Sequence, residues 1–191
     1  MKIGVLALQG AFIEHVKMLR SCGAEAFEVR NTEQLEGVDG LIIPGGESTT
    51  IGKLMVEYGF DRAIPELARS GVAIYGTCAG LILLAKEIAG SDQFRLGLMD
   101  MEAHRNAFGR QRESFETDLA IPELGSEPFR AVFIRAPYVT RVFGEAKALA
   151  EFHDRIVMIR QGRFLATAFH PELTGDPRIH QYFLDIAAGR K

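Results

Sequence analysis

The stretch Val72-Ala73-Ile74-Tyr75 runs directly into Gly76-Thr77-Cys78-Ala79-Gly80. The short apolar run is typical of a buried strand, and the residues from position 79 onward are typical of a helix. Glycines two positions either side of Cys78 suit a tight strand-to-helix turn, because bulk would clash where the backbone crowds itself. The stretch therefore predicts an α/β fold in which Cys78 begins a helix.

Short apolar runs alternate with amphipathic segments before and just after this stretch, as in βαβ units around a parallel sheet. We expect strands at 2–8, 24–29, 40–43 and 72–75. Helices are expected at 11–22, 31–36, 48–58, 60–69 and 79–89, with Pro65 interrupting the helix at 60–69.

The second half of the chain is richer in β-structure. Strands are expected at 98–103, 114–121, 129–134, 146–152, 155–160 and 164–169, with a tight hairpin at Gln161-Gly162. Asp176-Pro177 then begins a closing helix that ends at Gly189. Residues 1–191 are thus expected to form a single α/β domain. Its central sheet is mostly parallel, with helices on both faces and added antiparallel strands in the second half.

Composition excludes several classes of protein. Of the 191 residues, 47% are hydrophobic and 25% are charged, which is ordinary for a globular domain. A net charge of −3 favours neither nucleic acid nor an anionic membrane as a partner. Two cysteines are too few for a disulfide framework, and the longest apolar run, 79–85, is too short to span a membrane. We expect a soluble cytoplasmic protein.

Cys78 is a candidate nucleophile, because the amides and dipole of a helix N-terminus favour a thiolate. His170 is the candidate base, since it follows the run at 164–169 and would lie at the same sheet edge as Cys78. Glu172 could orient the imidazole, which gives Cys, His and Glu the roles of a triad. The alternatives are a buried structural cysteine and an ordinary histidine at a strand end. The other histidines are not expected in the site: His15 and His180 lie on expected helices, His153 in a turn and His104 in a polar stretch.

An acyl-transfer site also needs donors for an oxyanion. The amides of Ala79 and Gly46 are candidates, although the loop around Gly46 also fits a plain glycine turn before a helix. Arginine can bind an amino-acid carboxylate through two hydrogen bonds, and one or two arginines of this chain could do so. The alternative is that they are solvated surface cations. The candidates are Arg105, Arg110, Arg112 and Arg135. No spacing typical of metal ligands or phosphate loops occurs in the sequence, so we expect neither a metal nor a cofactor.

Motifs throughout the chain resemble those of one family, the glutaminase subunits of pyridoxal 5′-phosphate synthase (PdxT/SNO family), which are class I (triad) glutamine amidotransferases. The matching segments are Gly4-Val5-Leu6-Ala7-Leu8-Gln9-Gly10, Pro44-Gly45-Gly46-Glu47-Ser48-Thr49-Thr50, Gly76-Thr77-Cys78-Ala79-Gly80, Arg105-Asn106-Ala107-Phe108-Gly109-Arg110-Gln111, Phe133-Ile134-Arg135-Ala136-Pro137 and Phe169-His170-Pro171-Glu172-Leu173-Thr174. The turn around Cys78 and the His170-x-Glu172 pattern are shared by all triad amidotransferases. The segments at 45–49, 105–111 and 134–137 together are much more specific to this family. His104, before Arg105, departs from what the resemblance leads us to expect.

The resemblance implies a three-layer, flavodoxin-like α/β fold and hydrolysis of L-glutamine. Ammonia would pass to a separate synthase subunit (PdxS/SNZ type) that builds pyridoxal 5′-phosphate, in a large complex with a dodecameric core. By matching position, Cys78 would be the nucleophile, and His170 with Glu172 would complete the triad. Glutamine would contact Gly45, Gly46, Glu47, Arg105, Ile134 and Arg135. The family also implies weak activity without the partner, whose docking orders the oxyanion loop.

Two other functions stay open at this point. One is the glutaminase subunit of another triad amidotransferase, of the kind that makes anthranilate, guanylate (GMP) or imidazole-glycerol phosphate. The other is a non-catalytic binding module that kept the fold.

Overall fold

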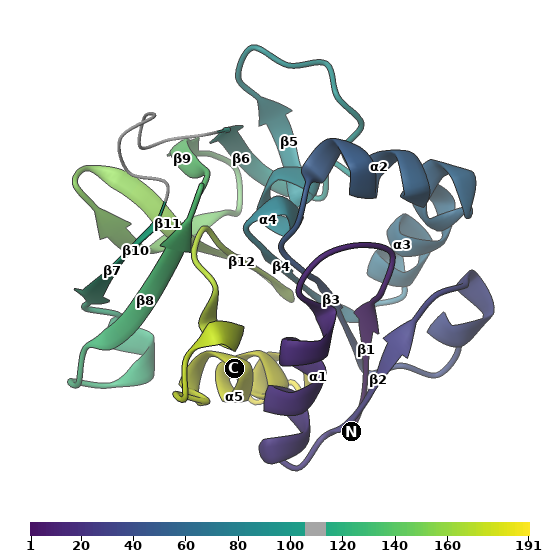
Figure 1. Ribbon diagram of the computed structural model, residues 1–191, viewed down its shortest axis with the longest axis horizontal. Helices are drawn as coiled ribbons and strands as arrows, with labels where there is room; N and C mark the ends of the chain where they lie inside the picture. The colour runs from purple at the N-terminus through teal and green to yellow at the C-terminus, as the bar shows by residue number, and fades with distance from the viewer. Residues whose placement is uncertain (106–113) are drawn as a thin grey trace.

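A mixed β-sheet runs through the protein and is covered by helices on both faces (Figure 1). The computed structural model describes residues 1–105 and 114–191, and in this part the sheet contains ten strands. Their order is β2-β1-β3-β4-β12-β11-β9-β6-β5, and β10 pairs with β11. The bounds are β1 (Lys2–Leu6), β2 (Glu25–Val29), β3 (Gly40–Ile43), β4 (Ala73–Thr77), β5 (Ala85–Ile88), β6 (Met99–His104), β9 (Tyr138–Val142), β10 (Lys147–Phe152), β11 (Arg155–Gln161) and β12 (Phe164–Thr167).

The first half of the chain builds the parallel part of the sheet. Strands β2, β1, β3, β4 and β12 all run parallel, whereas β11, β9 and β6 continue the sheet in antiparallel pairs. Every residue of β3 and β4 is buried, as expected for parallel strands covered on both faces. The predicted architecture, a mostly parallel centre with added antiparallel strands, is confirmed.

Helices α1 (Phe12–Ser21) and α5 (Arg178–Ala187) pack against each other on one face of the sheet. On the other face lie α2 (Ser48–Glu57), α3 (Phe60–Arg69) and α4 (Ala79–Leu84) (Figure 1). Short 3-10 helices are η1 (Thr32–Leu35), η2 (Pro122–Leu124) and η3 (Pro171–Leu173). Asp176 Oδ1 accepts a hydrogen bond from the Arg178 amide at 3.0 Å, but the N-cap residue of α5 is Pro177 and not Asp176 as predicted.

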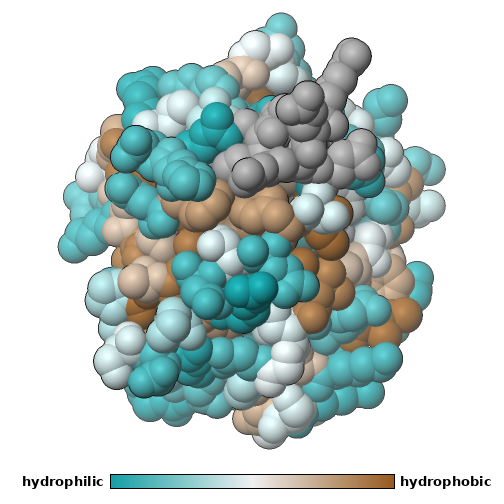
Figure 2. Space-filling model, turned by 60° about the vertical axis from the view of Figure 1, so that its left-hand side comes forward, coloured by the Kyte–Doolittle hydropathy of each residue, from teal (hydrophilic) through white to brown (hydrophobic). Residues whose placement is uncertain are grey.

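A separate two-stranded antiparallel sheet, β7 (Ser114–Leu119) with β8 (Phe129–Ile134), covers one side of the antiparallel strands. Residues along β7 alternate between exposed and more buried positions, and Phe115 stacks on Phe133 with ring centroids 4.7 Å apart. On this side of the molecule, apolar surface lies between hydrophilic groups (Figure 2).

Most predicted elements match the structure to within about two residues at each end. The helix predicted at 79–89 is wrong in its second half, where the chain forms β5 beside β6. Strand β9 was not predicted, because Pro137, directly before it, is typical of the end of a strand and not of its beginning. The interruption expected at Pro65 is also wrong: α3 continues through it. Within the described residues, we find no helix of the length and apolar character that a membrane crossing requires.

Candidate active site

Cys78 lies in the turn between β4 and α4 with a strained backbone, at φ 50° and ψ −100°. The two flanking glycines make this turn sterically possible. A Cβ atom on Gly76 would lie 2.5 Å from the Gly80 carbonyl carbon, and one on Gly80 would lie 2.1 Å from the Ile43 carbonyl oxygen. The steric reason for the motif that the sequence suggested therefore holds in the structure. The Cys78 amide donates to the Thr167 carbonyl at 2.8 Å, which ties the turn to β12.

His170 reaches the same site because β12 pairs in parallel with β4, with Thr167 opposite Thr77. Three residues beyond the end of β12, the His170 amide donates to the Val132 carbonyl of β8 at 2.8 Å. His170 Nδ1 lies 2.7 Å from Glu172 Oε1. The side chains of His170 and Glu172 are both buried. Because Cys78 and His170 line the same cavity, the structure brings together Cys78, His170 and Glu172, the three residues expected to form the triad.

The contacts among Cys78, His170 and Glu172 stabilise the charged forms of His170 and Glu172. Burial opposes protonation of His170, but its hydrogen bonds to Cys78 and Glu172, together with the charges of both groups, raise its pKa to about 10. Burial likewise opposes ionisation of Glu172, yet the neighbouring His15 and His170 hold the pKa of its carboxyl below the ordinary value. A charged imidazolium between two acceptors fits the geometry.

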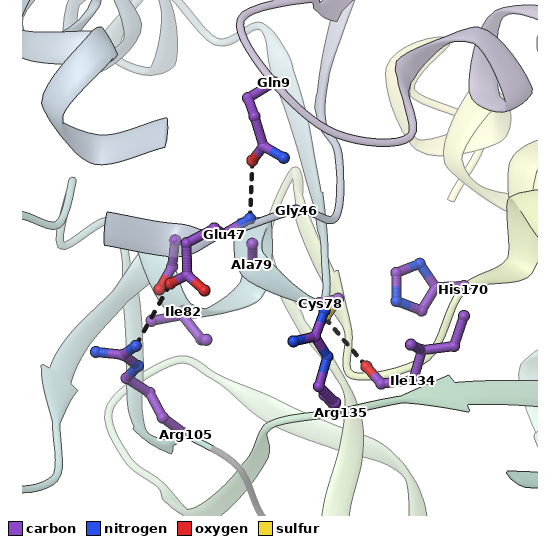
Figure 3. Close-up of a pocket in the computed structure, with 11 residues that line it drawn as sticks. Gln9, Gly46, Glu47, Cys78, Ala79, Ile82, Arg105, Ile134, Arg135 and His170 are labelled. Carbon is purple, nitrogen blue, oxygen red and sulfur yellow. Dashed lines mark hydrogen bonds and ion pairs between the residues drawn. The ribbon is translucent and has the colours of Figure 1, made fainter. Parts of the chain in front are cut away.

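A cavity of about 240 Å³ opens in front of Cys78 and His170 (Figure 3). Among its walls are five of the six residues expected to contact glutamine and the two expected to donate oxyanion amides: Gly46, Glu47, Arg105, Ile134, Arg135 and Ala79. The sixth, Gly45, does not line the cavity. It packs behind, where a Cβ atom would lie 2.5 Å from His170 Cε1, so only glycine leaves room for the imidazole.

Three further residues line the cavity that were not predicted as site residues: Gln9, Ser48 and Ile82. Gln9 Oε1 accepts a hydrogen bond from the Glu47 amide at 2.8 Å and so fixes the loop that carries Gly46. Its position just after β1, at the same sheet edge as Cys78, was the available signal. Ile82 lies one turn after Cys78 on α4, which helical spacing could have shown.

Of the four candidate arginines, the structure describes two, Arg105 and Arg135. Arg105 Nη2 lies 3.4 Å from Glu47 Oε1 across the cavity, and Arg135 directly follows β8 with a strained φ of 41°. Both line the cavity, as Figure 3 shows. Arg110 and Arg112, with the rest of the motif at 106–111, lie outside the described residues. His104 stacks on Tyr138, with ring centroids 4.9 Å apart.

Two histidines that the sequence did not associate with the site lie directly behind it. His15 and His180 are fully buried, and His15 Nε2 is 3.4 Å from Glu172 Oε2. Helical periodicity places both residues on inward faces, but it does not show that α1 and α5 meet at Glu172. Within the described part of the chain, no group of three or more histidine, cysteine, aspartate or glutamate side chains could hold a metal ion.

Comparison with known proteins identifies the family. A model of the SNO glutamine amidotransferase family matches residues 5–188. Proteins of Pelotomaculum thermopropionicum and Moorella thermoacetica, both named pyridoxal 5′-phosphate synthase subunit PdxT, are similar over full length. The first is 64% identical over 192 residues (100% of this chain, 98% of the relative), and the second 62% identical over 186 residues (97% and 99%).

A crystal structure of a glutamine amidotransferase is also similar, with a TM-score of 0.92 and 53% identity, and the match covers 97% of this chain and 98% of that one. PurLQS from Thermotoga maritima, at 16% identity and a TM-score of 0.72 over 96% of this chain and 97% of that one, shares the fold. These likenesses confirm the class I glutamine amidotransferase fold, and the chain belongs to the SNO glutamine amidotransferase family.

Proposed function

We propose that this protein hydrolyses L-glutamine to L-glutamate and ammonia as the glutaminase subunit of a pyridoxal 5′-phosphate synthase. The observation that carries the proposal is Cys78 in a strained strand-to-helix turn, beside the His170–Glu172 pair at the wall of one cavity. Full-length similarity to proteins named as that synthase's PdxT subunit supports the choice of pathway. Residues 1–191 would act as one domain in the reducing cytoplasm, where Cys78 stays a free thiol.

The first chemical step is attack of the Cys78 thiolate on the carboxamide carbon of the glutamine side chain. The amides of Ala79 and Gly46 would stabilise the oxyanion that forms, because backbone donors fixed in advance need no reorganisation. When the tetrahedral adduct collapses, the carbon–nitrogen bond breaks and His170 gives its proton to the departing nitrogen. The products of this step are ammonia and a γ-glutamyl thioester on Cys78.

In the second step His170 must act as a base, and acylation of Cys78 lowers the pKa of His170 so that it can. Of the influences that raise the pKa of His170, the hydrogen bond to Cys78 is the largest. Once the sulfur is acylated, this bond and the thiolate charge are lost, so the pKa of His170 falls. The neutral imidazole then takes a proton from the attacking water, and collapse of the adduct releases glutamate and restores the thiolate–imidazolium pair. The second water proton leaves with solvent as the product carboxyl ionises.

The cavity walls suggest how glutamine is oriented. Arg105 and Arg135 would bind the α-carboxylate, and Glu47 the α-ammonium group, since among the described residues these are the charged side chains of the cavity wall besides Cys78 and His170. Arg105 and Glu47 form an ion pair across the cavity. Glutamine would separate this pair and offer each partner an opposite charge. Contacts from the Gly46 and Ile134 backbone would complete the site.

Ammonia is useful downstream only while it stays unprotonated, which favours release into a partner over release into water. We therefore propose that a synthase subunit (PdxS/SNZ type) docks on this protein within a large complex and stimulates its glutaminase activity. The alternative partners, those of anthranilate, GMP or imidazole-glycerol-phosphate synthases, would not.

The test is to measure the rate at which the protein forms glutamate from L-glutamine. The rate is compared for the protein alone, with the synthase subunit of a pyridoxal 5′-phosphate synthase, and with each alternative partner. We expect stimulation by the first partner alone. Stimulation by another partner would redirect the proposal to that pathway, and no hydrolysis with any of them would overturn it.

A further inference from the structure

Two imidazoles are buried behind the triad and do not reach the cavity. His15 on α1 and His180 on α5 are both 0% exposed, and they are packed beside Tyr75 and Glu172. Burying polar rings costs free energy unless hydrogen bonds compensate, and apolar side chains would fill the same space without that cost. Packing alone therefore does not account for these two residues.

The contacts of His15 connect α5 to the catalytic carboxylate. Its Nδ1 lies 2.9 Å from His180 Nε2, and its Nε2 lies 3.1 Å from Thr77 Oγ1 and 3.4 Å from Glu172 Oε2. The other carboxylate oxygen, Oε1, is the one that His170 Nδ1 contacts. Glu172 Oε2 is buried and accepts no hydrogen bond among the described residues, so His15 Nε2 is the donor placed to meet it.

The positions of the protons follow from this arrangement. A carboxylate only accepts, so His15 Nε2 can meet Glu172 Oε2 only when it carries the ring proton, and the Thr77 hydroxyl, which can donate or accept, then accepts as well. Burial lowers the pKa of His15 and that of His180, against the opposing charge of Glu172 on His15, and both rings are therefore neutral. With Nε2 protonated, His15 Nδ1 accepts, and His180 Nε2 must donate to it. His180 Nδ1 is then a bare acceptor, which agrees with its lack of a partner among the described residues.

Among the titratable groups that face this pair, the Glu172 and Glu14 carboxylates raise the pKa of His15 and His170 lowers it, and burial outweighs the two carboxylates. Glu172, His170 and Glu14 act on His15 from η3, the segment before η3, and α1, while Tyr75 packs beside both rings from β4. Burial raises the pKa of Tyr75 well above its ordinary value, so its hydroxyl stays neutral and binds Thr167 Oγ1 at 2.9 Å.

We propose that His15, itself oriented by His180, is a positioning residue that holds the Glu172 carboxylate in the orientation that directs Oε1 to His170. The triad would thus extend through the core as His180, His15, Glu172, His170 and Cys78. His15 does not contact substrate, so its loss should lower kcat and leave KM unchanged. The inference rests on the proposed glutaminase activity.

Two matched variants separate the two nitrogens of His15. In His15→Gln the side-chain amide can reach the position of Nε2 and still donate to Glu172. In His15→Asn the shorter amide can replace only Nδ1, so the contact with His180 is kept and the one with Glu172 is lost. With the synthase subunit present, we expect kcat for glutamine to fall on the order of tenfold in His15→Asn, the size of effect seen when a metal-ligating side chain loses the hydrogen-bond partner that orients it. In His15→Gln we expect kcat to recover in large part.

The second readout is the pH titration of His170 by side-chain NMR, which a purely structural role would not move. A less firmly held Glu172 should lower the pKa of His170 in His15→Asn relative to wild type and His15→Gln. The inference is overturned if His15→Asn keeps wild-type kcat, or if both variants lose kcat and thermal stability together with His170 titrating as in wild type. If His15→Asn does not fold, His180→Gln and His180→Leu give the same comparison one step farther from Glu172. An inactive wild-type protein would instead count against the proposed function, whereas the titration would still test the contact.

Discussion

At the scale of single residues, the site depends on the strained backbone of Cys78. Its φ of 50° is costly for a residue with a side chain, and the turn persists because its neighbours leave no alternative. Gly80 lets the first turn of α4 approach β3, where Ile43 ends the strand. Strain of this kind presents the thiol at a helix N-terminus, beside a cavity.

Substituting Gly80→Ala should therefore destabilise the protein. The new Cβ atom would lie 2.1 Å from a backbone oxygen, so a strand or the helix must move, at a cost of about 1–3 kcal/mol in the free energy of unfolding. The same movement would displace Cys78 and lower glutaminase activity. Gly175→Ala is the control, because nothing lies within 4 Å of its Cβ position. Urea unfolding curves compare the three proteins, and equal midpoints would contradict this explanation of the turn.

His170 provides a prediction about pH. Its pKa is raised from the ordinary 6.5 to about 10, and a raised pKa extends the protonated form to higher pH. The imidazole should therefore stay charged through the neutral range and lose its proton only near pH 10. In Cys78→Ala the largest raising influence is gone, so the transition should move to lower pH. NMR titration of the ring measures both proteins, and a wild-type transition near 6.5 would contradict the ion-pair description.

At the scale of elements, Asp100 holds the region where helix prediction was wrong. Its carboxylate forms an ion pair with Lys86 of β5 and accepts from Gln161 Nε2 of β11 at 3.0 Å and from the Glu145 amide at 3.1 Å. The chain after Leu84 is rich in alanine, lysine and glutamate, which favour helix. Pairing with β6 and these long-range contacts select a strand instead.

Asp100→Ala should accordingly lower the free energy of unfolding by about 1–3 kcal/mol, because three donors lose their acceptor. The hydrogen bond from Lys86, followed by that from the Glu145 amide, lowers the pKa of Asp100. A lowered folded-state pKa gives stability that is present above the ordinary value of 3.8 and lost as pH falls through the lowered one.

Acid should consequently destabilise wild type more than Asp100→Ala. Asp118→Ala, which breaks an exposed pair with Arg130, should change stability little and serves as the control. Thermal unfolding between neutral and acid pH compares them, and an Asp100→Ala protein as stable as wild type would contradict the role of this carboxylate.

The same contrast explains which elements could be predicted. Local signals determine the parallel strands and the helices around them, since apolar periodicity and glycine stops are properties of short segments. Strand β9 and the end of α4 depend on partners far along the chain, which no local pattern reveals. Pro65 removes one helical hydrogen bond, but packing of α3 keeps the helix continuous.

At the scale of the whole molecule, the sheet order decides the site. Cys78 and His170 are far apart in sequence, and the parallel pairing of β4 with β12 brings the strand ends that carry them together. That much follows from the rule that parallel strands present ligand-binding residues at one edge. The meeting of α1 and α5 behind Glu172 depends on packing of the layers, so His15 and His180 could not be assigned from their own helices.

The central claim is that Cys78 is the nucleophile of a glutaminase. Covalent labelling of the nucleophile by a reactive glutamine analogue tests this claim most directly. The protein, with the synthase subunit present, is incubated with a diazoketone analogue of glutamine, and the modified residue is located by mass spectrometry of its peptides. We predict one label per chain, on Cys78, with Cys22 unmodified, protection by L-glutamine, and no labelling in Cys78→Ala. Labelling of another residue, or equal labelling of Cys78→Ala, would contradict the account.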